Sequence, residues 1–196
     1  MGRKKAYDRD ELLVGAVEVF REHGFARTTT QMLVDRLGVN RFSLYAEFEN
    51  KLGLYDAALE AYDESIVGRR FGPLERPGAG LAEVRELLEF YGAAADGPAA
   101  GKGCLLCNTA VEFGPDDPIG TGRVDRYLDR LEEAFSAALT NAQQAGDLPA
   151  SVNVAREASF LTASVLGLFV MIRARAPDAR LKNAAAAALA HLEGLG

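Results

Sequence analysis

The chain has 196 residues, of which 48% are hydrophobic, and its formal net charge at pH 7 is -6. This length suffices for one sizeable core or for a small module joined to a larger one. Residues 1–13 hold a basic cluster without the apolar segment of a signal peptide, and the chain has no run of eighteen apolar residues. We therefore expect a cytoplasmic protein that does not enter a membrane.

The acidic residues are concentrated in the later part of the chain. Residues 1–55 contain nine lysines and arginines against eight acidic residues, whereas residues 56–196 contain thirteen against twenty. The basic cluster Arg3–Lys5 precedes the first predicted helix, and Arg41 and Lys51 lie at the two ends of an aromatic stretch. A negative total argues against a nucleic-acid partner, but this distribution allows a locally positive surface near the amino terminus.

The periodicity of apolar residues is helical almost throughout, which predicts an all-α fold. Capping residues and glycines give the boundaries of the first three helices. The expected helices run from the cap Asp8 to Gly24, from the threonines at 28–30 to Gly38, and from the cap Asn40 through Phe48. The apolar stripe of the first helix is Leu13, Ala16, Val17 and Phe20.

A fourth helix is expected from Lys51 to about Gly68, capped by Asn50. Its inward-facing apolar stripe is expected to be Leu52, Tyr55, Leu59, Tyr62 and Ile66. The segment "FGPLERPGAG" then interrupts the helical pattern, because its prolines and glycines do not continue a helix. Five more helices bring the total to about nine: Leu81–Ala95, Gly103–Phe113, Pro118–Ala145, Val154–Ala176 and Asp178–Leu195.

The expected helix from Val154 is apolar most of the way round, whereas one apolar stripe suffices to cover a monomer's core. A helix that is apolar on opposite faces needs a second partner. With the alanine-rich last helix beside it, the same pair of helices from another subunit fits this need, which predicts a homodimer through the last two helices. The alternative is a central helix buried within one chain.

The stretch "GVNRFSLYAEFENK", residues 38–51, places four large apolar side chains in one short run. A helix of about eight residues is not stable alone, so its aromatic residues must anchor it against the first two helices. Leu44 and Phe48, four residues apart, would face this small core and hold the polar face outward. Three short helices with a tight turn at Gly38 are typical of a helix-turn-helix.

The segment "TTTQMLVDRLGVNRFSLYAEFENKLGL", with "AVEVFREHGF" before it, closely resembles the DNA-binding domain of the TetR family of transcriptional regulators. The shared elements cover about a quarter of the chain at the family's spacing. They are Gly24-Phe25, Thr28-Thr29, Gly38-Val39, Tyr45-x-x-Phe48 and Lys51.

The resemblance implies a dimer that binds double-stranded DNA, with the third helix of each subunit in the major groove at half-sites of a near-palindrome. The implied DNA-binding residues are Thr29, Thr30, Arg41, Phe42, Ser43, Tyr45 and Lys51. Alternatives remain open at this point. The threonines can be helix caps only, Phe42 can be a core residue or contact a thymine methyl group, and Arg3–Lys5 can be a solvated tail or an arm on the phosphates.

Glu47 departs from the family pattern, in which this position of the recognition helix often holds an aromatic residue, a histidine or another residue compatible with phosphates. A carboxylate beside DNA phosphates is repelled. Either Glu47 points away from the DNA, toward Arg41 or Lys51, or it accepts a hydrogen bond from a cytosine amino group.

The resemblance also implies two domains: residues 1–50 form the helix-turn-helix domain, and residues 51–196 form the effector-binding and dimerisation domain. The two DNA-binding domains of the dimer can lie at two different spacings. A small-molecule effector that binds one spacing more tightly than the other would shift the population toward that spacing. The candidate lining of its pocket is Phe90, Tyr91, Cys104, Asn108, Phe113 and Tyr127. Aromatic residues at helical spacing also occur simply as core.

Cys104 and Cys107 leave a second class of function open, a thiol-based redox sensor or a metal-binding protein. The metal interpretation is short of ligands, since the two histidines, His23 and His191, lie far away in sequence. Buried cysteines also act as small apolar residues. We find no catalytic motif, metal site or cofactor motif. The sequence thus predicts a ligand-responsive repressor that is not an enzyme and needs no cofactor.

Overall fold

The computed structural model describes residues 7–114 and 118–195, and within these residues it contains helices and no strand. The expected basic arm, Arg3–Lys5, and part of the predicted break at 114–118 lie outside them. The helices are α1 (Arg9–His23), α2 (Thr30–Leu37), α3 (Arg41–Phe48), α4 (Lys51–Tyr62), α5 (Gly68–Phe71), α6 (Leu81–Gly92), α7 (Leu105–Glu112), α8 (Pro118–Ala145), α9 (Val154–Arg173) and α10 (Asp178–Glu193).

A π-helical turn, Asp63–Val67 (η1), joins α4 to α5 without a break, so Lys51–Phe71 is one continuous helix. Counted in this way, the described residues form nine helices, and the predicted all-α fold is confirmed. The sequence did not reveal the π turn. Such turns occur often at functional sites, because one extra residue changes the direction of the side chains that follow.

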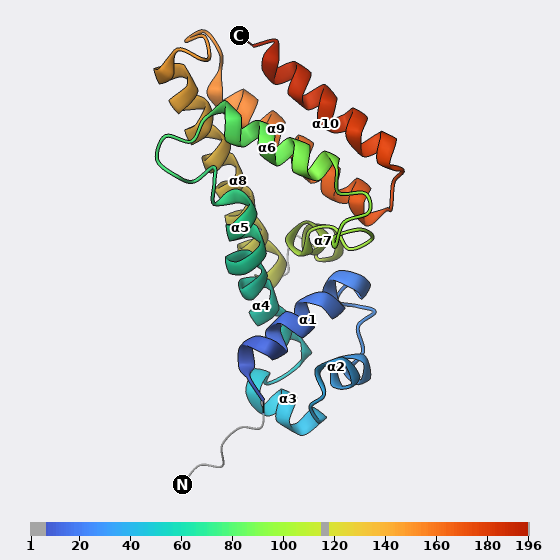
Figure 1. Ribbon diagram of the computed structural model, residues 1–196. Helices are drawn as coiled ribbons and strands as arrows, with labels where there is room; N and C mark the ends of the chain where they lie inside the picture. Colours follow the sequence, from blue (N-terminus) through green and yellow to red (C-terminus); the bar gives the residue numbers. More distant parts are fainter. Residues whose placement is uncertain (1–6, 115–117, 196) are drawn as a thin grey trace.

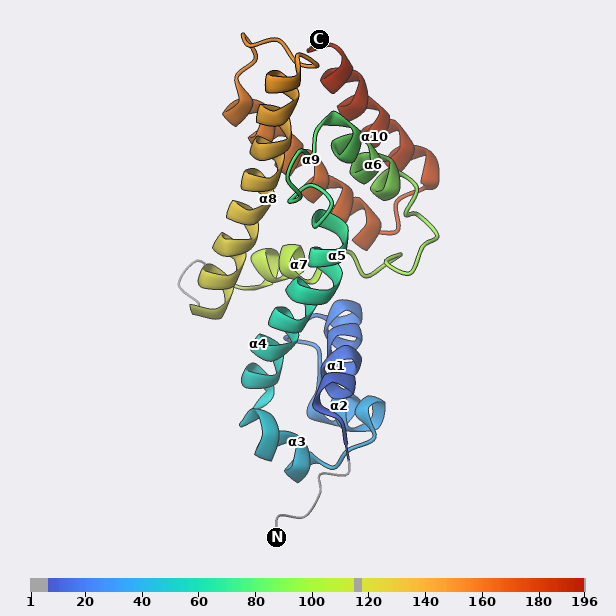
Figure 2. The same ribbon diagram turned by 60° about the vertical axis from the view of Figure 1, so that its left-hand side comes forward.

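The helices form two groups along an elongated molecule (Figure 1). Helices α1–α3 lie at one end, and α6, α9 and α10 lie at the other end, near the carboxyl terminus. The helix from α4 to α5 runs from the first group into the second, and Figure 2 shows the long α8 beside it with α7 crossing near α1. The chain therefore places a small three-helix unit at the tip of a larger helical body.

Capping residues set the starts of the first three helices as the sequence predicted. The Asp8 carboxylate accepts a hydrogen bond from the Asp10 N–H at 2.8 Å, the Thr29 hydroxyl from the Met32 N–H at 3.2 Å, and the Asn40 side chain from the Ser43 N–H at 2.8 Å. Gly38 ends α2 in the left-handed region, with φ 66° and ψ 21°. A residue with a Cβ atom adopts this conformation only at a cost, which explains a glycine at the turn.

Several later helices are shorter than predicted. Helix α7 starts at Leu105 and not at Gly103, because Gly103 has a positive φ of 64° and its carbonyl accepts a hydrogen bond from Arg21. Helix α6 ends at Gly92, α9 at Arg173 and α10 at Glu193, each two or three residues before the predicted end. Helix ends are the least certain part of a prediction from periodicity.

The apolar stripe predicted for α1 is buried, and the inner side chains of α4 join the same core. Leu52 is an exception: it was expected to face inward, but 38% of it is exposed, because it lies in the first turn of α4, beyond the core. The core continues from the three-helix unit into the body through Tyr55, Leu59 and Tyr62.

Helix α9 is the central helix of the body and packs against α6, α8 and α10. By length and composition alone it is apolar enough to cross a membrane, with a mean hydropathy of 1.5 in its most apolar window. Its buried residues, including Leu161, Val165 and Leu168, face the other helices. Burial in this core accounts for the apolar character of these α9 residues.

Candidate nucleic-acid interface

The inner face of α3 anchors this short helix to the rest of the three-helix unit. Leu44 is fully buried and Phe48 is 5% exposed. The guanidinium carbon of Arg9, at the start of α1, lies 5.5 Å from the centre of the Phe48 ring. The two side chains therefore hold α3 as the sequence predicted, and the opposite face of the helix points to solvent.

The outer face of α3 presents Arg41 and Phe42 at its amino-terminal end. Phe42 is 84% exposed, so it is not a core residue. The guanidinium carbon of Arg41 lies 5.7 Å from the centre of the Tyr45 ring. Arg41, Phe42, Tyr45 and Ala46 together line a shallow hollow of about 580 Å³. A cation, an exposed ring and a hydroxyl on one open helix face can reach phosphates and base edges.

Hydroxyl groups from α2 and α3 meet beside this face. The Thr30 hydroxyl lies 2.6 Å from the Tyr45 hydroxyl, and one donates to the other. Thr29 is exposed, and its hydroxyl caps α2. The amino terminus of α2 thus combines exposed N–H groups with a hydrogen-bonded hydroxyl pair, an arrangement that suits an anion.

Ser43 and Glu47 lie on a side of α3 that turns toward α1. The Ser43 carbonyl accepts a hydrogen bond from the Tyr7 hydroxyl at 3.5 Å, and Ser43 is only half-buried. The Glu47 carboxylate lies 3.6 Å from the Arg9 guanidinium and accepts a hydrogen bond from Tyr7 at 3.3 Å, with its side chain 10% exposed. Glu47 therefore points away from solvent, and these partners differ from the expected Arg41 and Lys51.

Lys51 ties the loop between α1 and α2 to the start of α4. Its ammonium donates to the carbonyl oxygens of Phe25 and Thr28, at 2.9 and 3.0 Å, and lies 4.2 Å from the centre of the Phe25 ring. The sequence suggested a phosphate contact for this lysine. Because an ammonium has three donors, Lys51 keeps one N–H for such a contact while it orders the loop.

The turn between α3 and α4 is unusually tight. Glu49 has φ 63° and ψ -54°, and the Asn50 N–H donates to the Phe48 carbonyl at 2.7 Å, which closes a three-residue γ-turn. This form of γ-turn is strained for a residue other than glycine. It sets the angle between α3 and the long helix that enters the body.

The loop between α1 and α2 is also bound to α7 of the body. The Glu112 carboxylate accepts hydrogen bonds from the Phe25 N–H at 2.8 Å and from the Ala26 N–H at 2.6 Å. The Phe25 ring packs against Tyr55 and Phe113, with centroids 5.0 and 5.2 Å apart. Gly24-Phe25, one of the elements shared with the TetR family, therefore lies where the three-helix unit meets the body.

Comparisons with known proteins agree with this architecture. Residues 12–58 match the family described as "Bacterial regulatory proteins, tetR family", and residues 80–188 match "Tetracyclin repressor-like, C-terminal domain". The chain belongs to the TetR family. It is a DNA-binding transcriptional regulator and not an enzyme, and its fold is a helix-turn-helix unit followed by a helical carboxyl-terminal domain.

Relatives of this TetR-family chain match along nearly their whole length. The HTH-type transcriptional regulator YezE of Bacillus subtilis (strain 168) is 32% identical over 93% of this chain and 95% of its own. The HTH-type transcriptional repressor ComR of Escherichia coli (strain K12) is 28% identical over 96% and 90%. A solved structure of a cysteine mutant of the TetR regulator CifR, complexed with a 26-base-pair operator, matches with a TM-score of 0.84 and 26% identity, over 96% of this chain and 98% of that chain.

The six residues expected to line an effector pocket lie in four places. Phe90 and Tyr91 line a cavity of about 510 Å³. The Cys104 thiol donates to the Tyr127 hydroxyl at 3.3 Å in the buried core. Asn108 borders a separate hollow of about 290 Å³, and Phe113 belongs to the aromatic cluster around Phe25. The structure therefore brings two of the six to the larger of these two cavities.

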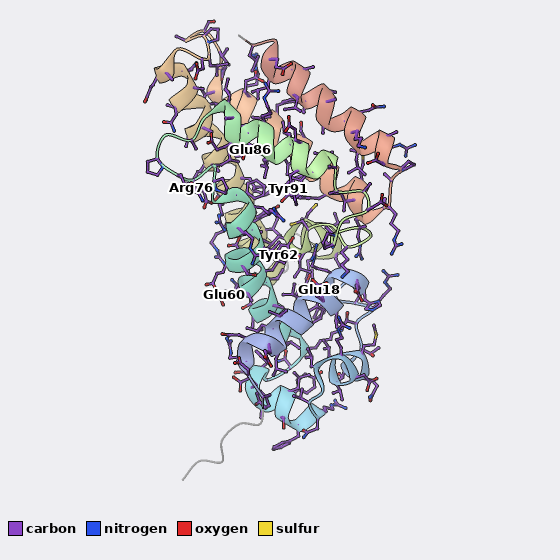
Figure 3. The ribbon with its side chains drawn as sticks, viewed as in Figure 1. Glu18, Glu60, Tyr62, Arg76, Glu86 and Tyr91 are labelled. Carbon is purple, nitrogen blue, oxygen red and sulfur yellow. The ribbon has the colours of Figure 1, made fainter. Side chains whose placement is uncertain are left out.

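This larger cavity lies where α1 meets the helices of the body, and Figure 3 shows three of the residues that line it. Tyr62 from α4 lies between Glu18 on α1 and Tyr91 on α6 in that view. Burial is the main cause that raises the pKa of both tyrosines above the usual value, so their hydroxyls stay protonated at neutral pH. They are available as neutral hydrogen-bonding groups.

The sequence did not predict the charged lining of this cavity, which comes from α1, α5 and the loop before α7. These residues are Glu18, Arg21, Arg69, Arg70 and Lys102. The basic pair at 69–70 follows the apolar stripe of the fourth predicted helix, which was a usable signal. The contributions of α1 and of the loop were not predictable, because they depend on contacts between residues about 80 positions apart.

The cysteine pair has the environment of a core. Cys104 is 2% and Cys107 is 9% exposed, and burial raises the pKa of the Cys107 thiol to about 12. Within residues 7–114 and 118–195, no three His, Cys, Asp or Glu side chains gather as metal ligands would. A protonated, buried thiol is a poor nucleophile and a poor metal ligand, so the geometry does not favour the thiol-based alternative.

Proposed function

We propose that the protein is a dimeric, cytoplasmic transcriptional repressor, which binds a near-palindromic double-stranded operator and is released by a small-molecule effector. In this proposal residues 1–50 read the DNA, and residues 51–196 bind the effector and form the dimer. The repressor named ComR and the operator complex of CifR, both similar to this chain over nearly its whole length, support it.

The observation that carries the proposal is the open outer face of α3. Its inner face is buried through Leu44 and Phe48, whereas Phe42 is the most exposed large apolar residue among those described. A large aromatic ring on an open helix face is free to contact a partner. At the start of a recognition helix, that contact is a thymine methyl group or a sugar in the major groove.

The neighbouring groups then have separate tasks. Arg41 and Phe42 reach base edges, and Ser43 and Tyr45 contact the backbone beside them. Thr29, Thr30 and Lys51 hold phosphates near the amino termini of α2 and α4. Glu47 takes no part in this contact, because its carboxylate is turned toward Arg9.

The dimer would form through α9 and α10, as the apolar pattern of α9 suggests. Val170 is 53% and Phe160 is 38% exposed on α9, and α10 carries exposed alanines at 186, 187 and 190. Small and apolar side chains on two adjacent helices suit close packing against the same pair from a second subunit. The carboxyl-terminal location of both helices leaves the two DNA-reading ends free (Figure 1).

Binding to the DNA upstream of the protein's own gene, measured by fluorescence anisotropy at several salt concentrations, tests the repressor. The logarithm of affinity should fall linearly with the logarithm of salt concentration, with a slope set by the number of phosphates contacted. Arg41→Ala should weaken binding and relax sequence preference, whereas the control Arg76→Ala, on the exposed loop after α5, should change neither. Equal binding of all DNA sequences by the unmodified protein would refute the proposal.

The mass of the protein in solution tests the dimer separately. Val170→Glu places a charge on the exposed face of α9, whereas the matched control Val14→Glu places one on α1, where Val14 is 66% exposed. Only the first variant should become monomeric in analytical ultracentrifugation. If both variants remain dimeric, the interface lies elsewhere.

A further inference from the structure

The cavity of about 510 Å³ has an apolar wall and a charged wall. Ile66, Phe90, Phe169 and Ile172 form much of the apolar side. The volume lies within the range of sites that enclose small organic molecules, about 300–1,000 Å³. A ligand for this site therefore has an apolar body of moderate size.

The charged wall is mainly cationic, with four basic residues against one carboxylate. Arg70 lies over the Phe90 ring, with its guanidinium carbon 3.7 Å from the ring centre. Neither Arg69 nor Arg70 forms an ion pair with any residue in the described part of the chain. Two exposed cations without a counter-ion at the edge of an apolar cavity attract an anion.

Both remaining cations of the lining are bound to the single carboxylate of the lining, and Lys102 also forms an ion pair with Glu22 of α1 at 3.1 Å. Glu18 accepts a hydrogen bond from Lys102 at 2.5 Å and one from Arg21 at 3.1 Å. Burial raises the pKa of the Glu18 carboxyl, but Lys102 and Arg21 more than offset this and hold the pKa below its usual value. The ionised Glu18 carboxylate thus occupies the position on Lys102 and Arg21 that a ligand anion could take.

This carboxylate belongs to the DNA-reading unit, whereas Lys102 belongs to the body. Glu18 is on α1, and Lys102 is in the loop before α7, where Arg21 also donates to the Gly103 carbonyl at 2.7 Å. The ion pair is therefore one of the links between the two parts. An anion that binds Lys102 in place of Glu18 would weaken this link.

The π-helical turn lies in the wall of the same cavity. Tyr62 precedes the turn, Ile66 is within it, and Arg69 and Arg70 follow it, all along one continuous helix. This helix also starts at Lys51, directly after α3. A ligand that contacts the residues around the turn thus contacts the helix that carries the recognition unit.

We propose that the effector is an amphipathic monoanion, such as a medium-chain or aromatic carboxylate. Its apolar body lies against Phe90 and Phe169, and its head group replaces Glu18 at Lys102. This inference rests on the proposed function for its effect on DNA, but the preference for an anion is a property of the cavity alone.

Isothermal titration calorimetry without DNA tests the ligand class, with octanoate, 1-octanol and octylamine as three probes of one chain length. Octanoate should bind saturably, and the neutral and cationic probes should bind at least about tenfold more weakly, since a charged hydrogen bond is lost. If 1-octanol binds as well as octanoate, or octanoate shows no saturable binding, the assignment is wrong.

Two variants with opposite expected effects test the competition. Lys102→Met should weaken octanoate binding about tenfold or more, whereas Glu18→Gln should strengthen it, because Lys102 then has one competing carboxylate, Glu22, in place of two. Arg70→Met should also weaken binding, and Arg76→Met, outside the lining, should not. Weaker binding in both Lys102→Met and Glu18→Gln would refute the competition, since loss of structure lowers affinity in every variant.

Operator binding with and without octanoate separates this inference from the proposed function. Reduced DNA affinity at saturating octanoate supports both. If octanoate binds with the expected charge preference and DNA affinity stays the same, the ligand class is supported and release through Glu18 is refuted. If the protein binds no DNA at all, the repressor proposal fails while the calorimetric result still decides the ligand class.

Discussion

Gly24→Ala should destabilise the protein more than its small size suggests. Gly24 ends α1 with φ 77° and ψ 173°, a backbone region that is populated almost only by glycine. A Cβ atom at this position would lie 2.9 Å from a carboxylate oxygen of Glu112. The substitution therefore strains the backbone and pushes Glu112 away from the loop that it binds.

The two effects have comparable magnitudes. A residue held in such a backbone region costs about 1–3 kcal/mol. Displacing Glu112 weakens its hydrogen bonds to the N–H groups of Phe25 and Ala26, each worth about 0.5–1 kcal/mol at this exposed site. We expect the free energy of unfolding to fall by about 2–4 kcal/mol in total. Gly38→Ala is the matched control, because Gly38 also has a positive φ but no atom within 4 Å of the added Cβ, and it should cost only about 1 kcal/mol.

Urea unfolding followed by circular dichroism, at one protein concentration, measures the loss of unfolding free energy in Gly24→Ala and in Gly38→Ala. The Glu112→Ala background then separates the two contributions. There, Gly24→Ala should cost only the backbone strain, so the two substitutions should be coupled by about 1 kcal/mol or more. Equal costs for Gly24→Ala and Gly38→Ala, together with no coupling to Glu112, would refute the role assigned to this contact.

Further predictions concern the recognition helix, the junction and acid stability. Phe42→Ala should change the unfolding free energy by less than about 0.5 kcal/mol, since Phe42 is 84% exposed, but should weaken operator binding in an anisotropy titration. Lys51→Met should lower the unfolding free energy by about 1–3 kcal/mol in urea titrations, because two carbonyl oxygens lose a charged donor. Glu49→Gly should raise the melting temperature, with a gain of about 1 kcal/mol from relief of the strained turn. The hydrogen bond from His191 at 2.6 Å holds the pKa of the Glu157 carboxyl below its ordinary value of 4.5. The ionised carboxylate therefore stabilises the fold above pH 4.5, and this stabilisation is lost as the pH falls through the lowered pKa. In urea titrations across this range, the unfolding free energy of Glu157→Gln should fall less on acidification than that of the unmodified protein.

The sequence predicted the features that depend on neighbours along the chain. The caps at Asp8, Thr29 and Asn40 and the turn at Gly38 are confirmed, because each needs only a side chain and a backbone group within a few residues. The anchoring pair Leu44 and Phe48 is confirmed for the same reason, since positions four apart share one face of a helix.

Contacts between distant residues were not predictable from one sequence. The partner of Glu47 is Arg9 and not Arg41 or Lys51, because the packing of α3 on α1 decides which cation is near. The cavity depends in the same way on Glu18 and Lys102, which are 84 positions apart. The aromatic residues Phe90 and Tyr91 were found because they share a local pattern, whereas the cations of the cavity lining come from three separate segments.

The positions of these distant contacts on α1 suggest how the cavity and the DNA-reading face communicate. Helix α1 packs on α4, and its polar contacts to α7, to α9 and to the loop before α7 lie in or just after its second half: Glu18 binds Lys102, Arg21 binds Gly103, Arg173 binds the Arg21 carbonyl, and Glu112 binds the loop after Gly24. The contacts to α3 lie at the opposite end, through Tyr7 and Arg9. About 14 Å of helix separates Arg9 from Glu18, at 1.5 Å per residue. Because a packed helix moves as a rigid body, loss of the Glu18 link would tilt α1 about its remaining contacts and move α3 with it. In the proposed dimer, a ligand would therefore change the spacing of the two recognition helices without touching either, and its effect would be limited by the difference in its affinity for the two arrangements.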